Sequence, residues 1–127
     1  MNAFDQLKEK LTEIANIRGA ASLLLWDQEV MMPKGAAALR ARQLSTLMGL
    51  HHHKFVHEAL PLLDKAMDSF DESTPFQQRN LIQTSRDVDK FVKLPNEHVR
   101  GTSQLASEAV HAWSEAKAKD DFSIFED

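Results

Sequence analysis

The sequence has no cysteine and no long hydrophobic run, and each absence excludes a class of protein. Without cysteine, the 127-residue chain can form no disulfide and offers no thiol nucleophile or thiolate metal ligand. Its longest apolar run spans residues 20–26, is interrupted by Ser22, and falls far short of the roughly 20 residues that a membrane-spanning helix needs. Charged residues among the first twenty positions leave no visible secretory signal. We therefore expect a cytoplasmic protein.

A basic stripe is also lacking, which argues against nucleic acid as a partner. The net charge is -4, and the acidic excess lies in the second half of the chain. Aromatic and basic residues do not alternate as they would on a surface that binds single strands. Hydrophobic residues make up 43% and charged residues 27%, a balance typical of a folded domain. We expect residues 1–127 to form a single helical region, with neither nucleic acid nor membrane as a partner.

Apolar residues recur at spacings of three and four along most of the chain, and no five-residue segment alternates as a strand would. This pattern predicts an all-α fold, an antiparallel array of about five or six helices. The first helical stretch should end before Pro33 and be bent or broken at Gly19. Asn2 and Thr74 are the expected N-caps. Further helices are expected over residues 35–55, 57–69, 75–93 and 96–119.

Each predicted helix carries a stripe of apolar residues that should face the core. The residues expected on these buried stripes include Leu39, Leu44, Leu47, Leu50, Leu81, Ile82, Val88, Val92, Val110 and Trp113. Trp26 is interpreted as a further core anchor.

Six histidines raise the question of a metal site, and two weak patterns are present. His53 and His57 are four residues apart, but the zinc-protease pattern His-Glu-x-x-His fails because Pro61 occupies the second histidine position. We expect these two residues, together with His51 and His52, to be surface or partly packed side chains. Glu108 and His111 form a single Glu-x-x-His pair, whereas di-iron bundles use two, so an exposed contact within one helix is favoured.

Two acidic and two basic residues lie near the first expected helix end. Asp27 and Glu29 are two residues apart and do not share a helix face, so they form no convergent acid–base pair. Asp27 is interpreted as a hydrogen-bonding partner. Arg40 and Arg42 could clamp a carboxylate, or one could cover apolar surface while the other pairs with a neighbouring helix. Both alternatives stay open.

In combination, these residues resemble a known family. The most specific part is the Trp26-Asp27-Gln28-Glu29 run within residues 21–29, which leads into Met32-Pro33 and Gly35. The order then continues with Arg40-Ala41, Gln43-Leu44, Thr46-Leu47, Leu50, His52, Lys93-Leu94-Pro95, Ala112-Trp113, Glu115-Ala116, Asp121-Phe122 and Phe125. Across essentially its whole length the chain resembles the N-terminal region of the thermostable carboxypeptidase (carboxypeptidase Taq) family. It departs from the family pattern at Val30, where threonine is more usual, and in its richness in histidine at residues 51–53.

The resemblance implies a larger, almost wholly helical metalloenzyme that removes single amino acids from the C-termini of peptides and is commonly a homodimer. Its divalent metal, zinc or else cobalt or manganese, is held by a His-Glu-x-x-His helix and a downstream glutamate. None of those motifs matches a position of this sequence, so the resemblance assigns no catalytic, cofactor-binding or metal residue here. It implies a segment that frames the substrate groove and is inactive by itself.

Three hypotheses follow from the sequence. The first is the N-terminal part of a metallocarboxypeptidase, cut from a longer chain, because three large apolar residues stand at its end, within residues 122–125. The alternative is a free-standing helical interaction or dimerisation module without catalytic activity. The third is a metal sensor built on His53 and His57, for which we expect weak binding or none.

Overall fold

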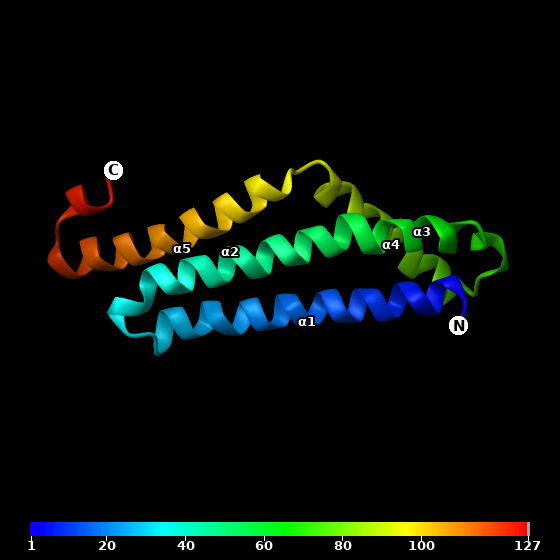
Figure 1. Ribbon diagram of the computed structural model, residues 1–127, viewed down its shortest axis with the longest axis horizontal. Coiled ribbons are helices and arrows are strands. Elements are labelled where there is room, and N and C mark those ends of the chain that lie inside the picture. The colour runs from blue at the N-terminus through cyan, green and yellow to red at the C-terminus, as the bar shows by residue number, and fades with distance from the viewer. Residues whose placement is uncertain (127) are drawn as a thin grey trace.

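Helices and short turns make up the computed structural model, which describes residues 1–126 (Figure 1). No strand occurs in that range, so the all-α prediction is confirmed. The five α-helices are α1 (Ala3–Val30), α2 (Ala37–Lys54), α3 (Leu60–Met67), α4 (Pro75–Val92) and α5 (Asn96–Lys119). Short segments connect them: 3₁₀ turns η1 (Lys34–Ala36), η3 (Phe70–Glu72) and η4 (Phe122–Ile124), and a π turn η2 (Phe55–Ala59).

The first helix is a single rod of 28 residues. Asn2 caps its start, since the side-chain oxygen accepts a hydrogen bond from the Asp5 N–H at 2.8 Å. The prediction of a break at Gly19 was wrong. A glycine inside a helix costs about 1 kcal/mol, and α1 is held on both sides of that position by buried Ile14 and Ala21. Packing on the neighbouring helix therefore outweighs the weak local preference.

The second and third helices form one continuous rod through the π turn, where a helix break was expected. Pro61 lies just beyond this turn, and a proline ring inside an α-helix clashes with the carbonyl four residues earlier, that of His57. In the wider turn the Leu60 N–H bonds to the Phe55 carbonyl, five residues back. The chain thus widens where the proline would otherwise interrupt it.

The second half of the chain begins with the helix cap that the sequence predicts. Thr74 caps α4, and its hydroxyl and the Gln77 side chain bond reciprocally to backbone N–H groups, with Pro75 as the first helical residue. At the other end, α5 stops at Asp120, which adopts the left-handed conformation at φ 51°. The chain then turns back, and the Phe125 ring contacts the Trp113 ring at a centroid distance of 5.4 Å.

Two different contact regions hold these helices together. One is an aliphatic core shared by α1, η2, α3 and α4, whose buried members are Leu7, Ile14, Ala59, Leu63, Ala66, Leu81 and Val88. The other is the long side-by-side contact between α2 and α5, visible in Figure 1 as the middle and upper rods. Small or polar residues of α2 are buried there, among them Ala41, Ser45 and Gly49.

Several apolar positions predicted to face the core are exposed, and those predictions were wrong. Trp26 is 56% exposed and is no core anchor. A helix stripe is buried only where another helix covers it, and parts of α1, α2, α4 and α5 have no such cover among residues 1–126. The other exposed members of the predicted stripes include Leu39, Leu50, Ile82, Val92, Val110 and Trp113.

Candidate functional site

The histidines do not assemble a metal site. The His53 and His57 rings lie 4.5 Å apart on the exposed side of the α2–η2 rod, as the spacing suggested. Within residues 1–126, no three His, Asp or Glu side chains are grouped so that they could hold a metal ion. By themselves, residues 1–126 therefore offer no complete set of ligands for a peptidase metal. That the chain supplies no metal ligand stays a prediction.

His51 and His52 are buried, contrary to the expectation of surface or partly packed side chains. His51 packs against the rings of Phe55 and Phe91, at centroid distances of 5.6 and 5.4 Å. Its Nδ1 atom has no hydrogen-bond partner among the described residues. Burial lowers the pKa of His51 below its ordinary value, and the charges of Arg18 and His52 act in the same direction. The folded chain therefore disfavours the protonated form of this ring.

His52 has a different role, because it joins three helices. Its Nε2 atom lies 2.9 Å from the Phe91 carbonyl, which can only accept, so Nε2 carries the hydrogen. Nδ1 then accepts from the Asn96 amide at 3.3 Å, and the same amide donates to the Gly49 carbonyl at 2.7 Å. These bonds fix the end of α4 and the start of α5 against α2.

Asp27 and Arg40 form a tight contact beside the α1–α2 turn. Arg40 Nη2 lies 2.6 Å from Asp27 Oδ2, and Nη1 donates to the Leu24 carbonyl at the same distance. The interpretation of Asp27 as a hydrogen-bonding partner is confirmed, and Arg40 is the arginine that pairs with a neighbouring helix. Arg42 is exposed. Both groups of this pair join α1 to α2 beside the turn.

A polar groove lies between that turn and the second half of α5. Its volume is about 760 Å³. Next to it, Ser107 Oγ donates to Gln28 Oε1 at 2.7 Å, and Gln28 Nε2 donates to the Ser107 carbonyl at 3.3 Å, which ties α1 to α5. The groove is lined by Gln28, Glu29, Met32, Lys34, Gly35, Val110, His111, Ser114, Glu115, Ala118 and Lys119.

Charges of both signs face this groove. Lys119 Nζ lies 2.6 Å from Glu115 Oε1, and this hydrogen bond lowers the pKa of the Glu115 carboxyl and raises the pKa of Lys119. His111 and Lys34 lower the pKa of Glu115 further. In the Glu-x-x-His pair, Glu108 accepts instead from Gln104, at 2.9 Å, while His111 lines the groove. The groove could therefore bind a ligand that carries both a carboxylate and an amine or amide.

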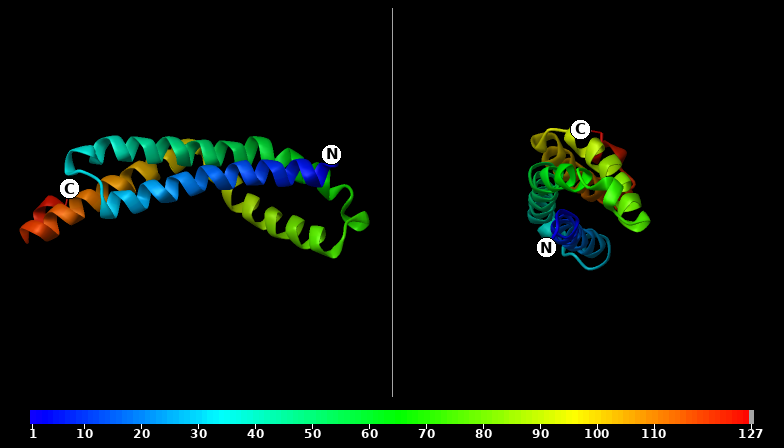
Figure 2. Two further views of the ribbon diagram at one scale, coloured as in Figure 1. Left: turned by 90° about the horizontal axis from the view of Figure 1, so that it is seen from below. Right: turned by 90° about the vertical axis from the view of Figure 1, so that its right-hand side faces the viewer.

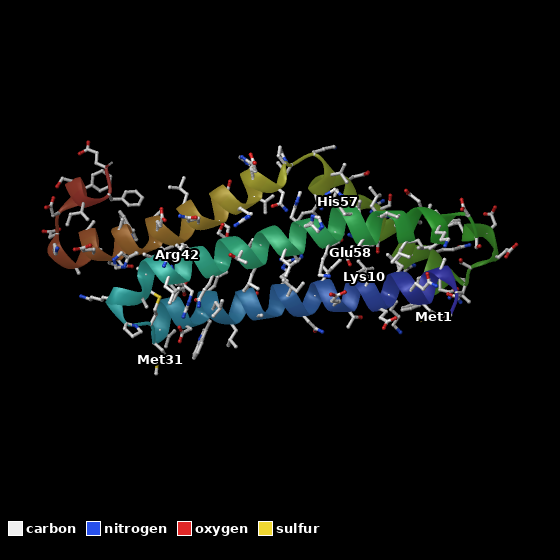
Figure 3. All side chains as sticks on the ribbon, viewed as in Figure 1. Met1, Lys10, Met31, Arg42, His57 and Glu58 are labelled. Atoms are coloured by element: carbon white, nitrogen blue, oxygen red, sulfur yellow. The ribbon has the colours of Figure 1, made fainter. Side chains whose placement is uncertain are left out.

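A second charged cluster, not foreseen from the sequence, joins α1 to the π turn. Lys10 Nζ lies 2.6 Å from both Glu13 and Glu58, and Lys54 Nζ lies 2.7 Å from Glu13 and 3.2 Å from Glu58. Figure 3 shows Lys10 and Glu58 close together at this junction. Hydrogen bonds from Lys10 and then Lys54 lower the pKa of Glu13 to about 2. Since four groups neutralise one another, the cluster is structural. Sequence spacing reveals only the pairs within one helix.

Comparison with known proteins identifies the family. The family model described as carboxypeptidase Taq (M32) metallopeptidase matches residues 6–127. The chain belongs to this family. Among M32 relatives, thermostable carboxypeptidase 1 of Pyrococcus furiosus is 36% identical over 126 residues, which cover 95% of this chain and 24% of the relative. Carboxypeptidase 1 of Bacillus subtilis is 27% identical over 123 residues, which cover 96% of this chain and 24% of the relative.

The M32 fold of this segment also matches a solved structure. A chain described as the BsuCP crystal structure superposes with a TM-score of 0.89 at 24% sequence identity, covering 97% of this chain and 25% of that one. The same helical arrangement therefore exists as part of a larger protein. This chain spans about a quarter of the length of the M32 relatives that it matches. No helix among residues 1–126 is both long and apolar enough to cross a membrane.

Proposed function

We propose that this chain is the N-terminal helical part of a metal-dependent carboxypeptidase that releases C-terminal amino acids from peptides. Family membership over residues 6–127 supports this proposal, as do the relatives, which are named carboxypeptidases. The metal, zinc or else cobalt or manganese, would be held by residues outside the range described here. A homodimeric, cytoplasmic enzyme belongs to the same proposal.

The role of this segment in the enzyme is to frame the substrate groove. The observation that supports this role is the polar groove between the α1–α2 turn and α5, which presents Lys34 and Lys119 beside Glu29 and Glu115. A peptide carries a terminal carboxylate together with backbone amide groups, and opposite charges on the groove suit both. The segment positions the peptide and leaves bond cleavage to the metal-bearing part, so the chain by itself has no peptidase activity.

The test uses a chimera in which this chain replaces the matched N-terminal quarter of the Pyrococcus furiosus relative. Lys34→Gln removes one charge from the groove and should raise KM for a blocked dipeptide about two- to fivefold, with little change in kcat. Lys90→Gln, on the exposed side of α4, is the matched control and should leave both constants unchanged. If Lys34→Gln behaves like the control, this groove does not meet substrate.

The separate chain is assayed in parallel with zinc, cobalt or manganese. We expect no release of amino acids from the same dipeptide. Metal-dependent release by the separate chain would contradict the proposal that the reactive centre lies elsewhere. A chimera without activity, beside a well-folded chain, would favour the alternative of a free-standing interaction module.

A further inference from the structure

A second groove, apolar in character, runs between the first half of α1 and the start of α4. Its volume is about 330 Å³. Leu7 forms part of its floor and is 1% exposed, whereas Phe76, at its edge, is 72% exposed. Lining residues come from α1 (Phe4, Leu7, Lys8, Leu11, Thr12, Ala15, Asn16) and from α4 (Phe76, Asn80, Thr84).

The groove is open because α1 and α4 share neighbours without packing along each other. Both contact α3 and the π turn, and these contacts form the aliphatic core. Figure 2 shows α4 inclined to α1, so that the start of α4 lies apart from α1. α1, the η2–α3 rod and α4 surround a common core, and they leave the fourth position of a four-helix bundle unfilled.

The spacing of the lining residues matches the side of a helix. On α1, Phe4, Leu7, Leu11 and Ala15 follow one another at intervals of three and four. On α4, the lining positions 76, 80 and 84 are four residues apart. Two such ridges, side by side, form the kind of surface into which a third helix packs its own ridge. Among the described lining residues, Lys8 carries the only charge.

We propose that the α1–α4 groove receives an amphipathic helix from the part of the M32 fold outside this segment. The helix places apolar side chains at i, i+3 or i+4, and i+7 against Phe4, Leu11 and Phe76, and an acidic side chain beside Lys8. Its source follows from chain length. Relatives with this segment have about three quarters of their residues outside it, and the segment keeps its arrangement within such a chain at a TM-score of 0.89.

This inference rests on family membership and is independent of where the substrate lies. Its first test measures binding between this chain and the Pyrococcus furiosus relative from which the matched quarter has been removed. We expect a one-to-one complex, which Phe76→Glu weakens about 30-fold or more by placing a charge in the apolar groove. Lys8→Glu should weaken it about two- to fivefold.

Ile82→Glu is the matched control, because Ile82 is 43% exposed on the same helix and does not line the groove. It should bind like the unaltered chain. Equal binding by Phe76→Glu and Ile82→Glu would overturn the proposal. So would self-association of this chain through Phe76, seen by sedimentation, because the occupant would then be a second copy.

A second measurement needs neither the truncated relative nor any enzymatic activity. Since the chain has no cysteine, Phe76→Cys and Ile82→Cys each introduce one thiol. In the separate chain both should react quickly with a thiol reagent. In the chimera, we expect the thiol introduced by Phe76→Cys to react at least about tenfold more slowly, while the thiol introduced by Ile82→Cys keeps its rate. The unaltered chimera gives the background reaction. Equal reactivity at both positions in the chimera would overturn the proposal, even if the substrate groove is confirmed.

Discussion

The aliphatic end of the molecule and the α2–α5 contact hold helices together in different ways. At the aliphatic end, large side chains such as Leu7, Leu81 and Val88 are almost fully buried, and these side chains have no group that could form a hydrogen bond. Where α2 and α5 approach each other, small residues such as Ser45 and Gly49 are buried, and hydrogen bonds cross between the helices, as from Ser45 to the Arg100 carbonyl at 3.0 Å. The first region depends on buried volume and the second on close approach of two backbones. Different substitutions should therefore destabilise the two regions.

The largest expected effect is at the aliphatic end. Leu81 is fully buried, and Leu81→Ala removes its contacts and leaves a cavity, which should lower the free energy of unfolding by about 2–5 kcal/mol. Urea denaturation followed by circular dichroism measures the change. Leu105→Ala, at a position that is 66% exposed on α5, should stay within about 0.5 kcal/mol. Similar losses for both variants would show that the aliphatic core is not the main source of stability.

A smaller effect is expected where α2 and α5 approach closely. A Cβ atom added at Gly49 would lie 2.5 Å from Arg100 Cγ, so Gly49→Val should cost about 1–3 kcal/mol. Adding Arg100→Ala should recover most of that loss, because the obstructing side chain is then gone. Gly19→Ala is the control, since nothing lies within 4 Å of its added Cβ, and it should stabilise by about 0.5–1 kcal/mol. No recovery in the double variant would mean that the backbones, and not Arg100, limit the approach.

The smallest expected effect is a loss of stability at acid pH. It arises at the junction of the two regions, where His51 packs against Phe55 and Phe91. Its folded pKa is lowered, so as pH falls below the ordinary value of 6.5 the unfolded chain binds a proton that the folded chain does not. The groups facing it are Arg18 from α1 and His52 from its own helix. Stability should therefore decrease below pH 6.5, before Glu13, with its pKa of about 2, begins to contribute below 4.5.

Thermal melts of His51→Leu between pH 7 and pH 5 check this dependence. The variant should lose the acid dependence of the unaltered chain. His53→Leu, at an exposed position, serves as the control and should keep it. An equal slope in all three proteins would assign the acid sensitivity to another group.

Much of the fold follows from the sequence, because caps and prolines act locally. The observed helix ends lie within a few residues of the predicted ones at Asn2, at Thr74 and before Pro33 and Pro95. The rod through Pro61 could not be predicted, since the π turn that accommodates the proline also contacts α1 and α4, which are distant in sequence.

The burial of side chains was harder to predict than the positions of the helices. The set of residues that line the polar groove was also harder to predict. A three-four stripe shows that a helix has an apolar side but does not say whether another helix covers it, which is why Trp26 is exposed. The polar groove joins the α1–α2 turn to residues about eighty positions later, and no spacing rule connects Lys34 with His111. The family resemblance could be recognised because it depends on the order of residues and needs no knowledge of contacts.

The π turn at residues 55–59 also changes which face of the α2–η2–α3 rod carries its buried residues. One extra residue in a turn rotates everything beyond it by about 100° relative to an uninterrupted α-helix. The buried positions read on through the turn at three-four intervals, from Ser45 and Gly49 to Leu63 and Ala66, yet the earlier ones meet α5 and the later ones meet α1 and α4. A single inserted residue thus lets one continuous rod contact α5 on one face before the π turn and α1 and α4 on another face after it.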